Sequence, residues 1–397
     1  MSDPEDFRRE TRAWLEDNCP ASVRAPVADI KYLYWGGRRA EFLDDDSQVW
    51  CERMLERGWT VPDWPVEYGG AGLSQSEQRI LQSEMRRLNC RPPLFSYGIT
   101  MLAPVLLEYG TDEQKSRFLP PIARGEIRWC QGYSEPAAGS DLASLQCRAV
   151  LEGGEYLVDG QKIWTSDADI SDWIFCLVRT DPSAPKHDGI SFLLIDLESG
   201  GVSISPIPLI SGASPFCQTF FDSVRVPSQQ RVGPENGGWS IAKHLLQHER
   251  AMLAQAIPGV RPPKRSSLLD VARRSLNTPQ GPLPDAGLRD ELVQLQMDRI
   301  CYRATLARNT AAVRAGKGPG SESSMFKLYV SELNQRSEDW RHRAAGTEGL
   351  GWDGEGFDPE EIQATRSWLY GKASTILGGT SEIQLNIIAK RVLGLPD

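Results

Sequence analysis

The sequence predicts a mainly helical α+β protein in which helical segments at both ends flank a central β-rich segment. Apolar residues recur at helical spacing up to about residue 127, and again from about residue 233 to the end. Between 128 and 232 they alternate with polar residues, and turn residues recur about every ten positions, which favours a small barrel or a sandwich. We therefore expect three domains, comprising residues 1–127, 128–232 and 233–397.

The composition excludes several classes of protein. The 397 residues include 44 Lys and Arg against 53 Asp and Glu, and the net charge of −9 leaves no basic footprint for nucleic acid. The longest charge-free stretch, Ser199 to Phe221, contains prolines and is not expected to span a membrane. The N-terminus is acidic and has no apolar signal segment, so we expect a cytoplasmic protein.

The eight cysteines and four histidines show no metal-binding or disulfide pattern. The cysteines are scattered without a Cys-x-x-Cys pair, and no histidine stands at metal-ligand spacing from them. This usage predicts reduced, mostly buried thiols and no metal site.

Local signals mark the ends of several elements in the helical and β-rich segments. Ser74 to Leu88 has helical apolar spacing and begins with a capping box, and Thr111 is expected to cap a second helix. Trp173 to Val178 and Ile190 to Ile195 are apolar runs of strand length. Asp159-Gly160 is expected to form a two-residue hairpin turn.

The last segment is expected to contain helices at 239–255 and 290–315. The stretch 258–287 between them is rich in Pro, Gly and Ser, and we expect a loop or a mobile lid there. Ser381 is expected to begin a final helix with a capping box of the Ser-x-x-Gln kind.

Two segments of the β-rich region have residue types suited to a ligand. The loop Tyr133 to Asp141 combines a proline, small residues and two serine hydroxyls that can point at one ligand, or it is an ordinary polar loop. Trp164 follows the predicted hairpin and can stack on a flat aromatic cofactor, or it is a core residue.

Two further candidates lie in the helical segment after residue 233. Gly378-Gly379 leads into a helix N-terminus that favours an anion such as a pyrophosphate, or it forms an ordinary turn. Glu249 is in an otherwise apolar helix, where burial would raise its pKa as a general base requires. The alternative for Glu249 is a structural pair with Arg250 or a solvated helix face.

Taken together and in this order, these segments resemble the acyl-CoA dehydrogenase family over nearly the whole chain. The matching motifs are Tyr109 to Lys115, Ser134 to Asp141, Asp159 to Ser166 and Gly378 to Gln384. The resemblance implies an N-terminal helical domain, a central β-barrel and a C-terminal four-helix bundle. It also implies FAD as cofactor and, usually, a tetramer.

The chemistry that the resemblance implies is α,β-dehydrogenation of an acyl-CoA thioester to a trans-2-enoyl-CoA. A base removes the α-proton, the β-hydride goes to flavin N5, and an electron-transferring flavoprotein accepts the electrons. In the medium-chain branch the base is a Glu at the position of Gly378, whose backbone N–H can still bind the thioester carbonyl. The isovaleryl- and long-chain-type branch instead has a Glu before an Arg on the central helix, which Glu249-Arg250 matches.

The resemblance also assigns residues to the flavin. Gln131, Tyr133 and Ser134 are expected to line it. Trp164 is expected to pack on the isoalloxazine, with Ser166 near N5.

Four more residues take roles from the resemblance. Thr380 and Glu382 are expected to contact the FAD phosphates or ribose. Ser140 is expected near the thioester arm of CoA, and Arg250 in the substrate pocket. The position of the base suggests a branched, cyclic or bulky acyl chain.

One family feature is missing and leaves alternatives open. The Arg-x-x-Phe-Gly stretch that reaches the FAD of a neighbouring subunit is absent from the corresponding region, Ala272 to Arg289. A subgroup with two different chains in one heterotetramer, sometimes acting on steroid side-chain CoA esters, is similar in this respect. The chain is then a homotetramer or a heterotetramer with a paralogue. It is alternatively a non-catalytic or half-site subunit, or an acyl-CoA oxidase-type flavoenzyme.

Overall fold

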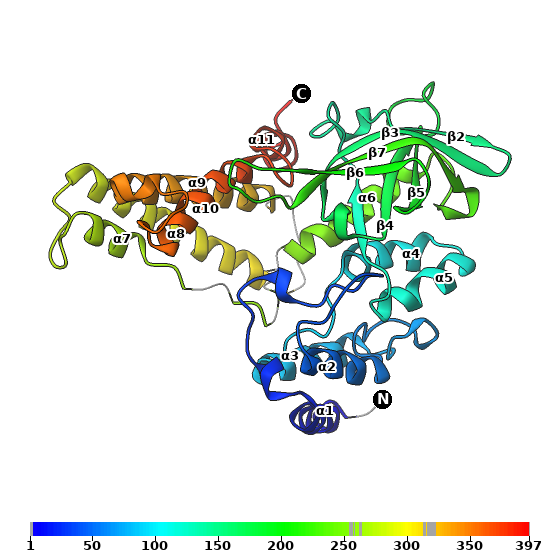
Figure 1. The fold of residues 1–397 in the computed structure, drawn as a ribbon, viewed down its shortest axis with the longest axis horizontal. Helices are drawn as coiled ribbons and strands as arrows, with labels where there is room; N and C mark the ends of the chain where they lie inside the picture. Colours follow the sequence, from blue (N-terminus) through cyan, green and yellow to red (C-terminus); the bar gives the residue numbers. More distant parts are fainter. Residues whose placement is uncertain are drawn as a thin grey trace. The chain divides into compact units, whose positions relative to one another are not determined.

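The computed structural model describes residues 3–253, 257, 259–261, 264–312, 315 and 323–396. It comprises two compact units. The first contains Met1–Ile207 and Pro215–Pro263, and the second contains Pro208–Ser214 and Lys264–Asp397. Figure 1 shows the helices and strands of both units along the chain. No helix in the described part of the chain is long and apolar enough to cross a membrane.

The first unit begins with helices that have clear end signals. They are α1 (Pro4–Asn18), α2 (Asp45–Glu56), α3 (Gln75–Arg87), α4 (Ala103–Tyr109) and α5 (Asp112–Ala123). Both predicted caps are confirmed, because Ser74 and Thr111 form capping boxes with the residues three positions later. Buried Leu15, Trp50 and Leu81 belong to one apolar cluster that joins α1, α2 and α3.

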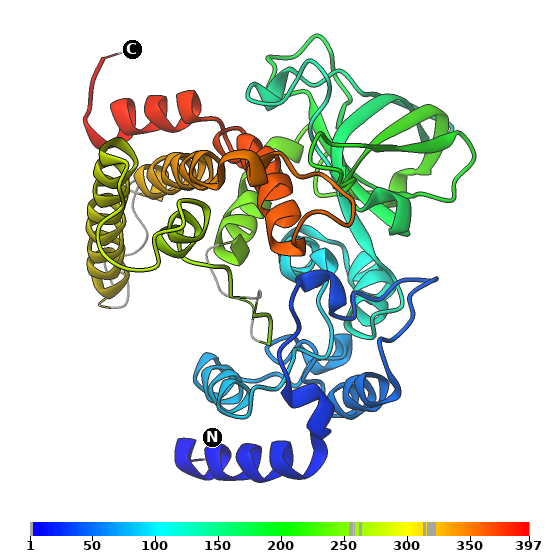
Figure 2. The same ribbon diagram turned by 60° about the vertical axis from the view of Figure 1, so that its left-hand side comes forward.

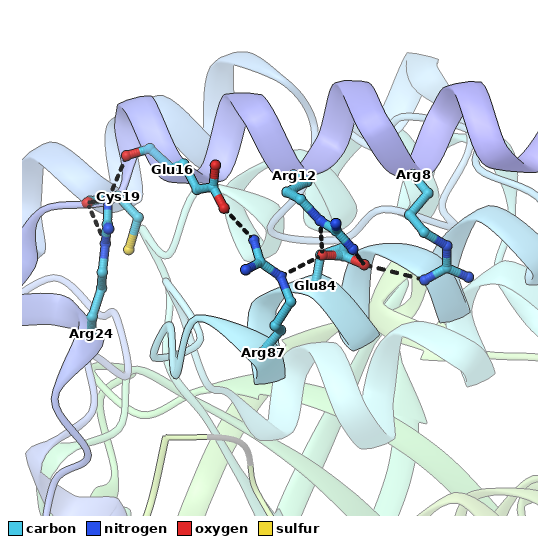
Figure 3. A network of polar contacts seen from close by, with 7 residues as sticks. All are labelled: Arg8, Arg12, Glu16, Cys19, Arg24, Glu84 and Arg87. Carbon is cyan, nitrogen blue, oxygen red and sulfur yellow. Dashed lines mark hydrogen bonds and ion pairs between the residues drawn. The ribbon is translucent and has the colours of Figure 1, made fainter.

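A buried carboxylate joins α1 to α3 (Figure 3). Glu84 on α3 is 2% exposed. It accepts hydrogen bonds from Arg8 at 3.2 Å and Arg12 at 3.0 Å on α1, and from Arg87 at 2.8 Å on its own helix. These partners hold the pKa of Glu84 down at about 2, chiefly through the Arg12 hydrogen bond.

The predicted β-rich segment is an eight-stranded sheet. Its strands are β1 (Trp129–Gly132), β2 (Arg148–Glu152), β3 (Glu155–Ser166), β4 (Trp173–Arg179), β5 (Ile190–Asp196), β6 (Val202–Ile207), β7 (Phe216–Pro227) and β8 (Arg231–Val232). Neighbouring strands follow the order β6-β7-β3-β2-β4-β5-β8, and β1 pairs in parallel with β4. Strands β4 and β5 are almost fully buried, which explains their continuous apolar runs.

The predicted turn at Asp159-Gly160 is wrong, since β3 runs straight through these residues. The hairpin between β2 and β3 turns instead at Gly153-Gly154, which have φ of +60° and +90°. Gly160 serves a close approach: a Cβ there would lie 2.8 Å from Cys147 Cα. The register of β3 against β7 shifts between Val158 and Gly160, so the glycine marks a bulge.

Helix α6 (Gly238–Leu253) packs against β5 and α4 in the first unit. Ile241, Ala242 and Leu245 are buried on this face. The predicted helix at 239–255 is therefore present, and its last two positions lie outside the described residues.

The second unit is helical. It contains α7 (Leu268–Ser275), α8 (Ala286–Ala312), α9 (Ser323–Ala345), α10 (Pro359–Gly371) and α11 (Ser381–Ile387). Helices α7, α8, α10 and α11 all pack against α9, and Figure 2 shows this grouping from a second side. Leu292, Leu333 and Trp340 lie in its buried core.

Two local predictions for the second unit are corrected. The stretch 258–287 is not a continuous loop, because Ser267 caps α7 and this helix buries Leu268 and Ala272. The final helix is capped by Thr380 rather than Ser381: the Thr380 hydroxyl accepts from the Ile383 N–H at 3.3 Å. A threonine at the preceding position therefore takes the role predicted for the serine.

Candidate active site

Strand β1 and the loop after it carry the first predicted flavin residues. Gln131 and Ser134 are half-buried, whereas Tyr133 is buried with its ring edge-on to Phe175 and Phe192. Gln131 and Tyr133 are two positions apart in extended chain, so their side chains share one face. The Tyr133 hydroxyl has no hydrogen-bond partner among the described residues.

The end of strand β3 presents Trp164 to solvent. Its register against β7 shifts between Lys162 and Thr165, and Trp164 takes a left-handed φ of +61°. The bulge keeps Thr165 buried while Trp164 is 49% exposed, edge-on to Phe216. Such a conformation is strained for an aromatic residue and points to a function at this position. Ser166 follows and is half-buried.

The two segments are joined by groups that the sequence reasoning did not single out. The Ile163 N–H donates to the Ser134 carbonyl at 2.9 Å. Lys162 is fully buried and lies 2.7 Å from a carboxylate oxygen of Glu135. The sequence pattern places Lys162 on the inward face of an alternating strand. A buried lysine needs a partner, so this position could have indicated the ion pair.

Glu249 on α6 extends to the sheet. The Gln131 side-chain amide donates to a Glu249 carboxylate oxygen at 3.4 Å. Burial, together with the nearby charge of Glu249, raises the pKa of Tyr133 well above its ordinary value. The structure thus brings the predicted base together with two predicted flavin residues. Arg250 belongs to the same helix, and its side chain lies outside the described residues.

Ser140 is exposed on the loop that follows Glu135. A tight turn starts this loop, with Glu135 and Ala138 exchanging backbone hydrogen bonds of 3.0 Å. Arg179 anchors its far end by donating to the carbonyls of Ala143 and Leu145. No hydrogen bond joins Ser140 to Glu249 in the described residues, so its place near a thioester arm stays a prediction.

The second unit holds the remaining predicted residues. Gly378 and Gly379 have left-handed φ of +64° and +93°. A Cβ on Gly378 would meet nothing within 4 Å. Glycine is therefore favoured here by the left-handed backbone and not by a lack of space. Lys327 donates to the Gly379 carbonyl at 2.6 Å, and Glu382 lies in the first turn of α11. Hydrogen bonds from its own backbone N–H and from Thr380 lower the pKa of Glu382.

Each unit, taken by itself, has groups that suit a part of an FAD molecule. In the first unit, the exposed Trp164 on β3 can stack on a flat ring. The segment after β1 offers polar groups for the edge of such a ring, namely the half-buried Gln131 and Ser134 and the buried, unpartnered Tyr133 hydroxyl. In the second unit, the Ser381 hydroxyl is buried without a hydrogen-bond partner in the described part of the chain. Such a hydroxyl is a suitable donor for a ribose or phosphate oxygen.

Comparison with known domain families gives three matches along the chain. The families are described as acyl-CoA dehydrogenase N-terminal domain, matching residues 2–126, middle domain, matching 130–224, and C-terminal domain, matching 236–393. The acyl-CoA dehydrogenase IpdE1 of Mycobacterium tuberculosis is 36% identical over 403 residues, covering 100% of this chain and 99% of that protein.

Solved structures are similar over the same length. The structure called Tcur3481-Tcur3483 steroid ACAD has a TM-score of 0.68 and 31% identity, covering 99% of this chain and 97% of that one. The ChsE4-ChsE5 complex of M. tuberculosis has a TM-score of 0.66 and 28% identity, covering 100% and 98%. Three domain matches and a full-length relative above 30% identity agree with the motifs. The chain therefore belongs to the acyl-CoA dehydrogenase family of FAD-dependent flavoenzymes.

Proposed function

We propose that this acyl-CoA dehydrogenase converts a branched, cyclic or bulky acyl-CoA to its trans-2-enoyl-CoA, with Glu249 as the base that removes the α-proton. The observation that carries the proposal is the contact between Glu249 and Gln131. It brings a carboxylate from α6 to the strand that leads into the predicted flavin loop. Gly378, at the alternative position for the base, has no side chain that can accept a proton.

The proposed roles of the chain's own groups follow from their chemistry. Glu249 accepts the α-proton at a carboxylate oxygen, while the Gln131 amide orients that carboxylate. The backbone N–H of Gly378 donates to the thioester carbonyl, which makes the α-proton more acidic. When bound, FAD supplies the hydride acceptor. Trp164 packs on the ring, and Ser166 contacts its edge.

The substrate class and the partners are further parts of the proposal. Two observations support a bulky or ring-bearing acyl group. The proposed base lies on α6 and not at Gly378, and the name of one similar structure describes it as a steroid ACAD. The named ChsE4-ChsE5 complex supports a heterotetramer with a paralogue, and a homotetramer is the alternative. We further propose an electron-transferring flavoprotein as acceptor. Eight free cysteines, seven of them buried, support a cytoplasmic location.

A half-site subunit is a second candidate function. The region 272–289, which lacks the Arg-x-x-Phe-Gly stretch, uses its arginines internally. Arg274 donates to Ser266 at 3.0 Å and pairs with Glu360 at 3.6 Å, both within the second unit. These contacts favour a chain that depends on a partner for complete FAD binding.

The first experiment is the visible absorption spectrum of the purified protein, recorded alone and then anaerobically with straight, branched and cyclic acyl-CoAs. We expect flavin bands that bleach with bulky acyl-CoAs. A protein that stays colourless with added FAD, and gains flavin only on co-expression with a paralogue, would support the half-site subunit. Peroxide formation in air would instead indicate an oxidase.

The base is tested with Glu249→Gln, which keeps the size of the side chain and removes its basicity. We expect the rate of flavin bleaching to fall by about 1,000-fold with FAD still bound. The matched control is Gln161→Leu, an exposed amide on β3, which should leave the rate unchanged. Full activity in flavin-loaded Glu249→Gln would rule out this residue as the base.

A further inference from the structure

A buried ion pair joins the two segments that carry the predicted flavin contacts. Lys162 on β3 has no solvent exposure, and Glu135 in the loop after β1 is 8% exposed. The Lys162 Nζ donates to Glu135 Oε1 at 2.7 Å and to the backbone carbonyl of Tyr133 at 3.2 Å. The proposed mechanism uses neither charge, so the pair needs its own explanation.

The Glu135 carboxylate also holds the return of its loop. It accepts the backbone N–H of Gln146 at 2.6 Å and that of Cys147 at 2.9 Å. Together with Lys162, three donors therefore point at one buried carboxylate. The loop is fixed at both ends, because these two residues directly precede strand β2.

The ion pair lies next to the bulge in β3 that exposes Trp164. Lys162 is the last residue of β3 in register with β7 before the bulge, and Trp164 lies two positions later at φ +61°. Between them, the Ile163 N–H bonds to the Ser134 carbonyl at 2.9 Å. Lys162 thus binds the carbonyl of Tyr133, and Ile163 binds the carbonyl of Ser134. These two neighbouring contacts hold the loop backbone next to the bulge.

The energetic balance indicates that the ion pair fixes the geometry of the backbone and adds little to the stability of the fold. Burying two charges costs desolvation energy that their attraction recovers only in part, and an apolar pair of similar volume is often as stable. An ion pair with directed hydrogen bonds, however, specifies one arrangement of backbone that an apolar contact does not.

We propose that Glu135 and Lys162 are positioning residues for the flavin. Their ion pair fixes where the backbone of Tyr133 and Ser134 lies relative to the bulge in β3 that exposes Trp164. The inference rests on the proposed assignment of these residues to the flavin. It adds a role for two charges that do not themselves contact the ring.

The test compares FAD binding with folding in the double variant Glu135→Gln/Lys162→Met, which removes both charges and nearly keeps the volumes. We expect the apoprotein to keep its thermal midpoint within a few degrees, since no unpaired buried charge remains. FAD affinity should fall by at least about tenfold, and the visible circular dichroism of bound flavin should change. Wild-type affinity and an unchanged spectrum in this variant would overturn the proposal.

Two further variants keep the test decisive. If the double variant does not fold, Lys162→Arg retains the charge with a different reach, and its flavin dichroism must then differ from wild type. Glu84→Gln removes another buried carboxylate, on α3 among the N-terminal helices, and it should lower stability without changing FAD affinity or dichroism.

These readouts separate the inference from the proposed function. They measure flavin binding and do not use turnover, so an error in the base or in the substrate class leaves the comparison valid. Failure of the wild-type chain to bind FAD would contradict the self-sufficient enzyme, and the same titration on the complex with its paralogue would then test the pair.

Discussion

At the scale of residues, Gln131 links strand β1 to the proposed base. Its amide N–H lies 3.4 Å from a Glu249 carboxylate oxygen, and the buried Tyr133 hydroxyl is on the same face of the chain. A donor beside a carboxylate stabilises its charged form and orients it. The family resemblance predicts that both residues line the flavin, but the contact of Gln131 with Glu249 depends on how α6 packs on the sheet.

The variant Gln131→Leu tests this contact. Loss of the donor should raise the apparent pKa on the acid side of the pH–rate profile, and lower the bleaching rate about tenfold. Stopped-flow measurements between pH 5 and 9 with a reactive acyl-CoA give both quantities. Gln161→Leu again serves as the control. An unshifted profile would show that Gln131 does not influence the base.

At the scale of elements, the ends of helices were easier to predict than the turns of the sheet. The capping box at Ser74 and the cap at Thr111 were predicted correctly, because a cap depends on contacts within three residues. Asp159-Gly160 has the residues of a hairpin turn, yet both residues continue β3, which pairs with β7, and a Cβ on Gly160 would lie 2.8 Å from Cys147 Cα. Whether turn residues form a turn also depends on packing with distant segments, and a local sequence pattern carries no information about that packing.

The contact between α1 and α3 leads to a prediction about stability. Glu84 has its pKa lowered from an ordinary value of 4.5 to about 2. Its contribution is therefore complete above pH 4.5 and is lost as the pH falls toward 2. We expect Glu84→Gln to lower the free energy of unfolding by about 2 kcal/mol at pH 7, a value reduced by the partial exposure of the arginines.

Chemical denaturation at pH 7 and at pH 3 measures this effect. The difference between wild type and Glu84→Gln should shrink at the lower pH. Glu10→Gln, which removes an exposed carboxylate from α1, should change stability by less than about 0.5 kcal/mol at either pH. A pH-independent difference for Glu84→Gln would contradict the assignment of the stabilisation to its charge.

At the scale of the whole molecule, the second unit leaves apolar surface uncovered in a single chain. Val293, Met297 and Ile300 on α8 are 53%, 53% and 65% exposed, and their spacing places them on one face of the helix. Such a face fits the tetramer that is usual in the family. The division into domains at residues 127 and 232 stays a prediction, while the structure separates two compact units.

We expect Ile300→Glu to dissociate the assembly, because a charge in an apolar contact is costly unless it is paired. Sedimentation velocity at several protein concentrations reports the change in mass. The control Gln75→Glu adds the same charge at an exposed position on α3 and should leave the assembly intact. An assembly that is unaffected by Ile300→Glu would show that this face of α8 is not an interface.

The sequence alone was sufficient for the order of helical and β-rich segments, the family motifs and the main caps, because these depend on residue types over short distances. Only the tertiary structure decided that Trp164 leaves the core at a bulge, that Glu249 extends to Gln131, and that Lys162 is buried against Glu135. Register, burial and the pairing of charges arise from segments far apart in the chain. They are determined when those segments pack, and no local pattern specifies them.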